Sequence, residues 1–542
     1  MLRIKERNLQ KMLTVNDLTL SFTGQVLFKD INLKFVPGNC YGIIGANGAG
    51  KSTFLKILAG TLEPTKGSVS IEKNCRMSVL EQDHHKYDEY DAITTVIMGN
   101  KPLYEIMTEK DAIYAKPDFS EEDGVRAGEL EAKFAELDGW EAESDAAALL
   151  NGLGIGVEKH YTLMENLDGR DKVKVLLAQA LFRKPDVVLL DEPTNDLDIE
   201  CIEWLEEFLM DFPGAVIVVS HDRHFLNTVC THIVDIDYNS IKMYTGNYDF
   251  WYESSRLMQQ LIKNQNKKRE EKIRELQSFI QRFSANKSKS KQATSRRRLL
   301  ENITVEEMPA SSRRYPFVGF EMEREPGKDI LQVSDLAGEV DGVTLFKNVN
   351  FTLGAGDKVA IIGENDLAKT ELFKILAGEK EAKEGNVRWG VTISTSYFPS
   401  DNTEFFDGNN MNLVDWLRQY SKDQTETYIR GFLGRMLFSG DEVYKPVKVL
   451  SGGEKVRCML SRMMMYSANM LLLDQPTNHL DLESITAVNE GLCAFKGNVI
   501  FACHDLQFVE TVANRIIELR EDGCVDFKGT FEEFNEWKRK YD

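Results

Sequence analysis

The feature that most restricts this chain is an internal repeat. The segment YGIIGANGAGKSTFLKILAG at 41–60 returns as VAIIGENDLAKTELFKILAG at 359–378, and VVLLDEPTNDLD at 187–198 returns as MLLLDQPTNHLD at 470–481. Self-similarity over such long stretches indicates that one folding unit has been duplicated. A chain of 542 residues is also too long for a single hydrophobic core, so two large domains with appendages are expected.

The spacing between the copies shows where they differ. Lys51 and Lys369 are 318 residues apart, whereas the offset is 283 at three later pairs: Leu167 and Leu450, Asp191 and Asp474, His221 and His504. The first copy therefore has 35 additional residues (318 − 283), which lie between Gln82 and Leu167. Helical apolar spacing and dense charge at 99–140 predict a helical arm at about 95–140, with a solvated insertion as the alternative.

Composition restricts the class of protein. With 42% apolar and 28% charged residues the chain reads as globular, and no run approaches the ~20 apolar residues that span a bilayer. The eight cysteines form no CxxC pair, so reduced thiols in the cytoplasm are the simplest interpretation.

A phosphate-binding loop is predicted in the first copy. GANGAGKS matches GxxxxGK[ST] between an apolar strand-like run and a helix-like run, so its backbone N–H groups would cradle phosphates, Lys51 would reach the β- and γ-phosphates and Ser52 would ligate Mg²⁺. The candidate ATP-binding residues here are Gly45, Ala46, Asn47, Gly48, Ala49, Gly50, Lys51, Ser52 and Thr53.

Two carboxylates and a histidine complete the predicted chemistry. Asp191 and Glu192 end the buried strand that begins at Val187, so Asp191 would hold Mg²⁺ through water and Glu192 would act as the base toward the attacking water. His221 follows the apolar run at 215–220 and is placed at the γ-phosphate. A lone histidine at a strand end is more often structural. The role of His221 therefore depends on its position after the phosphate loop and the strand-end carboxylates in the order of motifs along the chain.

Between the copies lies a basic segment on an acidic chain. The net charge is −20, but from Arg256 to Arg298 there are fourteen Lys and Arg against three Glu, a local charge of +11 that leaves about −31 elsewhere. Residues 250–303 contain no Pro or Gly, which predicts two packed helices joined by a basic tip; a plain spacer is the alternative.

These residues, with LSGGEKVR at 450–457 and the PTNDLD and PTNHLD elements, resemble the ABC-F family of tandem ATP-binding-cassette ATPases over nearly the whole chain. The resemblance implies an α/β fold of two P-loop nucleotide-binding domains with a helical linker. The expected divisions are an extension at 1–11, a first cassette at 12–249, a linker at 250–303 and a second cassette at 304–542.

The resemblance also implies further site residues. Phe22 would stack on adenine, Gln82 would contact Mg²⁺ and the attacking water, and Ser451, Gly452 and Gly453 would belong to a signature that faces the other copy's phosphate loop in a head-to-tail sandwich. It implies a ribosome-binding translation factor that reaches tRNA and rRNA at the 70S exit site, acting as a monomer without membrane partners. A transporter subunit and a DNA-handling ATPase are the alternatives.

The second copy departs from the pattern. Val340 stands at the place of Phe22 and Ser400 at that of Gln82, and Gln475 replaces Glu192. Its candidate nucleotide-binding residues are Gly363, Lys369, Thr370, Gln475 and His504. Asp366 and Ala368 stand where the first loop has glycines, and Ala368 would cost ~1–2 kcal/mol if it had to adopt positive φ.

The signatures depart in the opposite sense. LSGGEK is intact in the second copy, but the first has LDGRDK at 167–172, with Asp168 in place of the serine. In a head-to-tail sandwich all this damage falls on one composite site. The pattern therefore predicts one hydrolytic and one degenerate site; random decay or engineering is the alternative.

Overall fold

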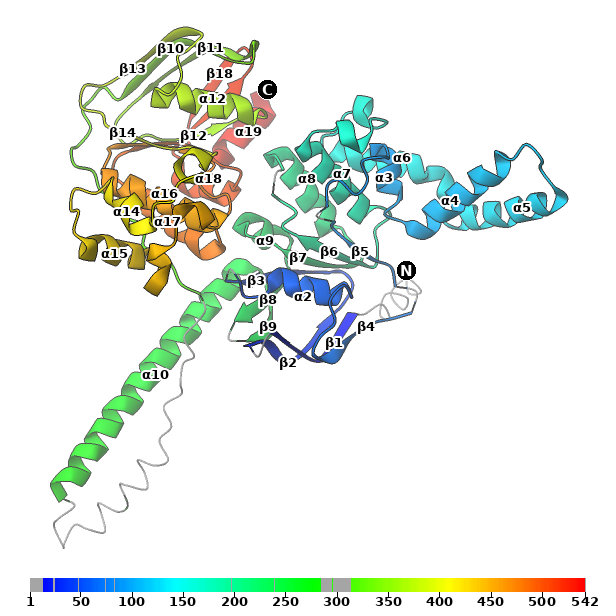
Figure 1. Ribbon diagram of the computed structural model, residues 1–542, viewed down its shortest axis with the longest axis horizontal. Coiled ribbons are helices and arrows are strands. Elements are labelled where there is room, and N and C mark those ends of the chain that lie inside the picture. The colour runs from blue at the N-terminus through cyan, green and yellow to red at the C-terminus, as the bar shows by residue number, and fades with distance from the viewer. Residues whose placement is uncertain are drawn as a thin grey trace.

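The structure is a computed structural model that describes residues 13–22, 25–46, 48–73, 75–81, 83–195, 197–237, 239–283, 295 and 313–541. Figure 1 shows two α/β units beside one another, with the hairpin α4–α5 projecting from the first and the long helix α10 extending away from both. Among the described residues, no helix combines the length and apolar character needed to cross a membrane.

Each copy contains the same pair of sheets. The larger sheets have the strand orders β5-β6-β7-β3-β8-β9 and β14-β15-β16-β12-β17-β18, and the smaller ones have β2-β1-β4 and β11-β10-β13. The first-copy strands are β1 Leu13–Phe22, β2 Gln25–Phe35, β3 Asn39–Gly45, β4 Lys66–Ile71, β5 Met77–Val79, β6 Val187–Asp191, β7 Ala215–Val219, β8 His232–Asp237 and β9 Ser240–Thr245. The second-copy strands are β10 Leu331–Val340, β11 Val343–Leu353, β12 Lys358–Ile362, β13 Glu384–Trp389, β14 Thr395–Phe398, β15 Met470–Asp474, β16 Asn498–Ala502, β17 Arg515–Arg520 and β18 Gly523–Lys528. This strand-by-strand match bears out the predicted duplication and α/β fold class.

The helices follow the same duplication. The first copy has α2 Lys51–Leu58, α3 Ala92–Ile97, α4 Lys101–Tyr114, α5 Glu121–Glu136, α6 Ala142–Gly152, α7 Gly169–Leu181, α8 Ile199–Met210 and α9 Arg223–Val229, followed by α10 Tyr248–Phe283. The second has α12 Asp366–Ala377, α13 Thr403–Phe406, α14 Leu413–Arg418, α15 Glu426–Arg435, α16 Gly452–Tyr466, α17 Leu482–Ala494, α18 Leu506–Val512 and α19 Phe531–Tyr541. Short 3₁₀ turns lie at η1 Gly139–Glu141, η2 Val157–Lys159, η3 Met164–Asn166, η4 Gly440–Tyr444 and η5 Val447–Val449.

The central strands are apolar along their whole length because both faces of the sheet are covered. In β6, Val188 and Leu190 pack into the cluster formed with α7 and α8, while Val187 and Leu189 pack on the other side with Phe54 of α2 and the small sheet. Alternation along a strand places successive side chains on opposite faces. The result is three layers, with the carboxyl ends of β3, β6 and β7 at one edge.

The additional residues of the first copy form the predicted helical arm. Helices α4 and α5 pack as a hairpin around Ile113, Ala127 and Leu130. The bidentate pair of Arg126 with Glu109 joins the two helices from outside. So small a core is matched by many exposed charges, which explains why periodicity and charge together revealed the hairpin.

Helix α10 is the described part of the predicted linker. Its first turns are anchored because Trp251 is buried under Arg313, whose guanidinium carbon lies 4.4 Å from the ring centre. Arg313 also joins both copies, at 2.5 Å from Asp235 of β8 and 2.9 Å from Glu483 of α17. The predicted second helix and basic tip, like the extension at 1–11, lie outside the described residues.

The two copies face each other through equivalent positions. Leu482 at the start of α17 is buried in the first copy's core cluster, and its counterpart Ile199 at the start of α8 packs against the second copy's cluster (199 + 283 = 482). Helices α9 and α18, which are also counterparts, contact one another. Contacts between equivalent positions are those of a pseudo-twofold interface.

Candidate ATP site

The first phosphate loop turns between β3 and α2. Gly48 and Gly50 have φ values of 80° and 98°, which residues other than glycine rarely adopt. A β-carbon on Gly50 would also lie 2.7 Å from the ring of Phe28. Lys51 folds back over the loop, with Nζ 2.9 Å from the carbonyl oxygen of Gly45, and burial lowers the pKa of this amine. The loop is therefore a preformed cradle with a buried cation at its centre.

Two carboxylates stand at the carboxyl end of β6. Asp191 and Ser52 both line the cavity beside the loop and supply the hard oxygen ligands that Mg²⁺ takes, so the residues present fit the predicted ion. Glu192 has a φ of 52° and donates its backbone N–H to the carbonyl of Val219 at 2.8 Å. This left-handed turn directs its side chain away from the strand and into the cavity.

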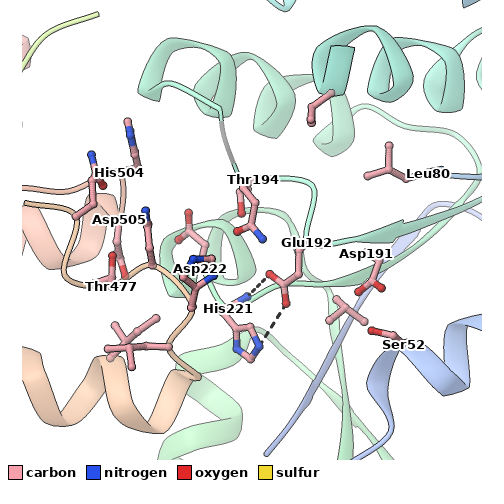
Figure 2. A pocket seen from close by; sticks show the side chains of 18 of the residues that line it. Ser52, Leu80, Asp191, Glu192, Thr194, His221, Asp222, Thr477, His504 and Asp505 are labelled. Atoms are coloured by element: carbon pink, nitrogen blue, oxygen red, sulfur yellow. Dashed lines mark hydrogen bonds and ion pairs between the residues drawn. The ribbon is translucent and has the colours of Figure 1, made fainter. Parts of the chain in front are cut away.

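Glu192 and His221 form a partly buried pair (Figure 2). The backbone N–H of His221 donates to Glu192 Oε2 at 3.1 Å, and its Nε2 lies 3.4 Å from Oε1. Burial raises the pKa of Glu192 to about 7, against the opposing charge of Lys51, and burial lowers the pKa of His221 to about 3. A neutral imidazole can donate one hydrogen bond to a phosphate, and a carboxylate with a pKa near neutrality can take a proton from water.

These groups open into a cavity of about 1070 Å³ between the copies. From the first copy it is lined by Gly48, Gly50, Lys51, Ser52, Thr53, Asp191, Glu192 and His221. The second copy contributes Asp366, Thr370, Ser400, Gln475, His479 and His504. The cavity is large enough for a nucleotide, and its phosphate-binding groups are concentrated on the first-copy side.

The predicted signature lies elsewhere in this arrangement. Ser451 caps α16 in a reciprocal bond with Glu454, and among the described residues that line the cavity none belongs to Ser451–Gly453. His479 packs against the signature, since a β-carbon on Gly453 would lie 2.8 Å from the carbonyl oxygen of His479. His479 and Leu480 line the cavity from the second copy, whereas the signature does not. Asn47, Gln82 and the side chain of Phe22 lie outside the described residues, so their roles stay predictions.

The second loop differs from the first in its backbone. Helix α12 begins at Asp366, three residues before Lys369, and Asn365 caps it by accepting from the N–H of Ala368 at 3.2 Å. Ala368 lies within this helix and is not among the positive-φ residues, so the expected cost of ~1–2 kcal/mol does not arise. The second copy therefore has an added helical turn where the first copy has a glycine-rich loop. The absence of glycine from residues 364–370 favours this turn.

The other candidate nucleotide-binding residues of the second copy lie at positions equivalent to those of their first-copy counterparts. Lys369 Nζ lies 2.8 Å from the carbonyl oxygen of Gly363, and Thr370 donates to Asp474 at 2.7 Å. Gln475 has a φ of 54°, almost that of Glu192. His504 lies 3.3 Å from the carboxylate of Asp366. The backbone turn that presents Glu192 in the first copy is therefore kept in the second, but there it presents an amide.

Comparison with known proteins identifies the architecture. A family model described as ABC transporter matches residues 28–195 and 346–478, and a second model with the same description matches 234–319. The chain belongs to the ABC-F group of ATP-binding-cassette proteins. It is 61% identical over 526 residues to a Bacillus subtilis protein described as the uncharacterized ABC transporter ATP-binding protein YkpA, with 97% of each chain covered.

Two further relatives extend the comparison. The chain is 45% identical over 524 residues to the probable ATP-binding protein YbiT of Escherichia coli O157:H7, covering 96% of this chain and 99% of that one. The solved structure of an archaeal ribosome recycling factor, aABCE1, has a TM-score of 0.62 at 18% identity, with 97% and 92% of the two chains covered. That likeness shows the tandem fold, and the family shows that this ABC-F protein is an ATPase.

Sequence reasoning missed one residue of the site, Arg170, and one residue of the interface between the copies, Arg313. Arg170 lies 2.7 Å from Asp366 of the other copy, and its signal was available because it occupies the place of Gly453 (170 + 283 = 453). Arg313 had no comparable signal, since its partners come from β8 and α17, and only the folded ABC-F chain brings them together.

Proposed function

We propose that this ABC-F protein is a cytoplasmic, ribosome-binding translation factor that acts at the tRNA exit site. The observation that carries the proposal is the basic linker on an acidic chain: a charge of +11 between Arg256 and Arg298 against a net charge of −20. Helix α10 carries part of this charge away from both cassettes (Figure 1). A projecting cationic element of this kind fits a nucleic acid. The positive linker attracts the phosphates of the nucleic acid, whereas the acidic cassettes repel those phosphates.

The arm and the fold support the same proposal. Helices α4 and α5 project from the first cassette in another direction, so the chain offers two separate extensions to a large partner. Solved relatives with this fold are described as an archaeal ribosome recycling factor and, at a TM-score of 0.56 and 19% identity, as ribosome-bound ABCE1 with Pelota. Their likeness concerns the fold, so the choice of an RNA partner here depends on charge.

We further propose that hydrolysis takes place at the first loop and requires Mg²⁺. Lys51 and the loop N–H groups would hold the triphosphate, and Ser52 and Asp191 would hold the ion, which neutralises developing charge on the phosphates. Glu192 would accept the proton of the attacking water, and neutral His221 would donate to the γ-phosphate. Gln82 and the Ser451–Gly453 signature would join this site when the cassettes close.

Ribosome co-sedimentation over a range of salt concentrations tests the RNA partner. Substituting the six basic residues of the predicted tip by glutamine should reduce binding and flatten the log–log salt slope, by roughly 0.7–0.9 for each phosphate that the linker no longer neutralises. These residues are Lys287, Lys289, Lys291, Arg296, Arg297 and Arg298. ATP affinity should not change, because the first loop is untouched.

A matched variant controls for total charge. It carries the same six-charge loss at exposed cassette lysines: Lys34, Lys242, Lys347, Lys448, Lys496 and Lys528. This variant should keep the ribosome affinity and slope of the natural chain. Equal behaviour of the two variants, or sedimentation with membranes instead of ribosomes, would remove the linker's assignment to RNA.

We also propose that the sandwich closes within one chain, with cassettes at 12–249 and 304–542 joined by the linker at 250–303. Glu192→Gln with ATP should give a monomer that is more compact by small-angle scattering than the nucleotide-free protein. An ATP-dependent dimer would contradict this, since it would show exchange of cassettes between chains.

A further inference from the structure

Two glycines of the standard loop and signature have been replaced at facing positions. Asp366 stands where the first loop has Gly48 (366 − 318 = 48), and Arg170 stands where the second signature has Gly453. The two side chains come from different copies, yet Arg170 Nη1 lies 2.7 Å from Asp366 Oδ2. Replacement by an acid on one side and a base on the other yields an ion pair across the interface.

The Asp366 carboxylate also gathers the groups that would otherwise bind phosphate. Lys369 Nζ lies 2.6 Å from Oδ1, and His504 Nε2 lies 3.3 Å from Oδ2. Burial raises the pKa of Asp366, but the hydrogen bond from His504 and the charges of His504 and Lys369 outweigh it and hold the pKa well below its usual range. Asp366 is therefore an anion with three cationic or donor groups around it.

The first copy shows what these groups do without a carboxylate in the loop. Gly48 has no side chain. Lys51 contacts the carbonyl of Gly45, as Lys369 contacts that of Gly363, and His221 lies against Glu192 at the end of β6. The space beside Gly48 belongs to the cavity. In the second copy the Asp366 side chain stands at this position of the loop, lines the same cavity and is only 21% exposed.

The backbone of the second loop has changed in the same direction. Its N–H groups at Ala368 and Lys369 are bonded to the side chain and carbonyl oxygens of Asn365, because α12 begins at Asp366. In the first copy the equivalent helix, α2, begins only at Lys51, after five loop residues that follow β3. Donors that would cradle a phosphate are thus committed to the helix start.

We propose that Asp366 takes the place of a nucleotide phosphate in the second composite site, and that its ion pair with Arg170 joins the two copies there without ATP. The chain then binds one ATP, at the first loop, and only that composite site opens and closes with nucleotide. This inference goes beyond the proposed function and holds whether or not the ribosome is the partner.

Nucleotide stoichiometry tests the first half. Equilibrium dialysis with a non-hydrolysable ATP analogue should give one nucleotide per natural chain and two for Asp366→Gly with Ala368→Gly, which restores the glycines of the first loop. Two nucleotides on the natural chain, or one on the double variant, would overturn the proposal. Photo-crosslinking of the natural chain with azido-ATP needs no variant: label should appear on first-copy peptides, and label on 363–370 would contradict the proposal.

A double-mutant cycle tests the ion pair. Arg170→Asp sets two carboxylates against each other, so it should lower the melting temperature more in the natural chain than in the Asp366→Asn background. The difference should shrink in 1 M salt because Arg170 is 54% exposed. Equal effects in the two backgrounds would show that Asp366 does not hold Arg170, and the nucleotide-free closure would have to be withdrawn.

Discussion

The two halves of this protein share a scaffold but not a site. Their large sheets have the same strand order, and the residue after the buried strand adopts the same left-handed turn at Glu192 and Gln475. Several side chains that would touch ATP have changed, as from Glu192 to Gln475, whereas the apolar strands β6 and β15 have kept their character. Core packing therefore preserves the backbone of a site even where the side chains that it presents differ.

The histidines make the same comparison at atomic scale. His221 lies against Glu192, the predicted base, while His504 lies against Asp366, a carboxylate of its own loop. One histidine is available to a phosphate and the other already has an internal anion. The difference is the one that we expect if the second half serves as the structural partner of the first.

The largest effect should come from Glu192, the proposed base. Glu192→Gln should reduce steady-state ATP hydrolysis by at least about 100-fold, because the base is lost while every group that binds phosphate remains. ATP affinity should stay within about threefold of its original value, since the substitution removes no phosphate-binding group. Filter binding and phosphate release measure the two quantities separately.

The matched control is the reverse change in the other copy. Gln475→Glu supplies a carboxylate on the same backbone, with Asp366 still in the adjacent loop, so hydrolysis should stay close to that of the natural chain. Recovery of activity in a Glu192→Gln, Gln475→Glu double variant would break the comparison between a working and a structural half.

The loop lysines should show a smaller but still asymmetric effect. Lys51→Ala removes a charged group that binds phosphate, worth about 1.5–3 kcal/mol, and should lower kcat/KM for ATP by roughly 10- to 100-fold. Lys369→Ala should lower kcat/KM by less than about twofold, because that amine neutralises Asp366. It should instead lower the melting temperature. Equal losses of kcat/KM from the two variants would contradict the asymmetry.

Local patterns account for what could be predicted. The duplication, the phosphate loop, the strand-end carboxylates and the arm at 99–140 each leave a periodic or motif signal in a short segment. At Ala368 the condition for backbone strain is not met, because the chain forms an added helical turn there. Helix propensity and the Asn365 cap decide this, and both are local.

Contacts between distant segments could not be predicted in the same way. The expected head-to-tail arrangement places the second loop against the first signature, but it does not specify that Arg170 and Asp366, 196 residues apart (366 − 170), meet as an ion pair. Arg313 contacts both Asp235 of β8 and Glu483 of α17, and no short segment of sequence relates these three positions. The placement of His479, rather than the Ser451 signature, in the cavity depends on how the cassettes face each other, which sequence motifs do not encode.

The smallest predicted difference between the halves concerns pH. In the first copy, His224 Nδ1 lies 3.0 Å from the buried carboxylate of Glu206. The hydrogen bond with Glu206, against an opposing effect of burial, raises the pKa of His224 to about 9, and the charges of Asp222 and Glu510 act in the same direction. The equivalent positions in the second copy are Gln507 and Asn489, which do not titrate (224 + 283 = 507; 206 + 283 = 489).

The sign of the effect follows from the raised pKa. An imidazolium that folding stabilises contributes fully below its ordinary pKa of about 6.5, and this contribution is lost as the pH rises through about 9. With the side chain 30% exposed, the contribution should be about 1–2 kcal/mol. His224→Gln, which copies the second half, should therefore melt a few degrees below the natural chain at pH 6.5 and at nearly the same temperature at pH 9.5. Gln507→His adds a histidine without a facing carboxylate and should show no such convergence. A constant gap between the natural chain and His224→Gln across this pH range would mean that packing, and not the ion pair with Glu206, distinguishes the two halves here.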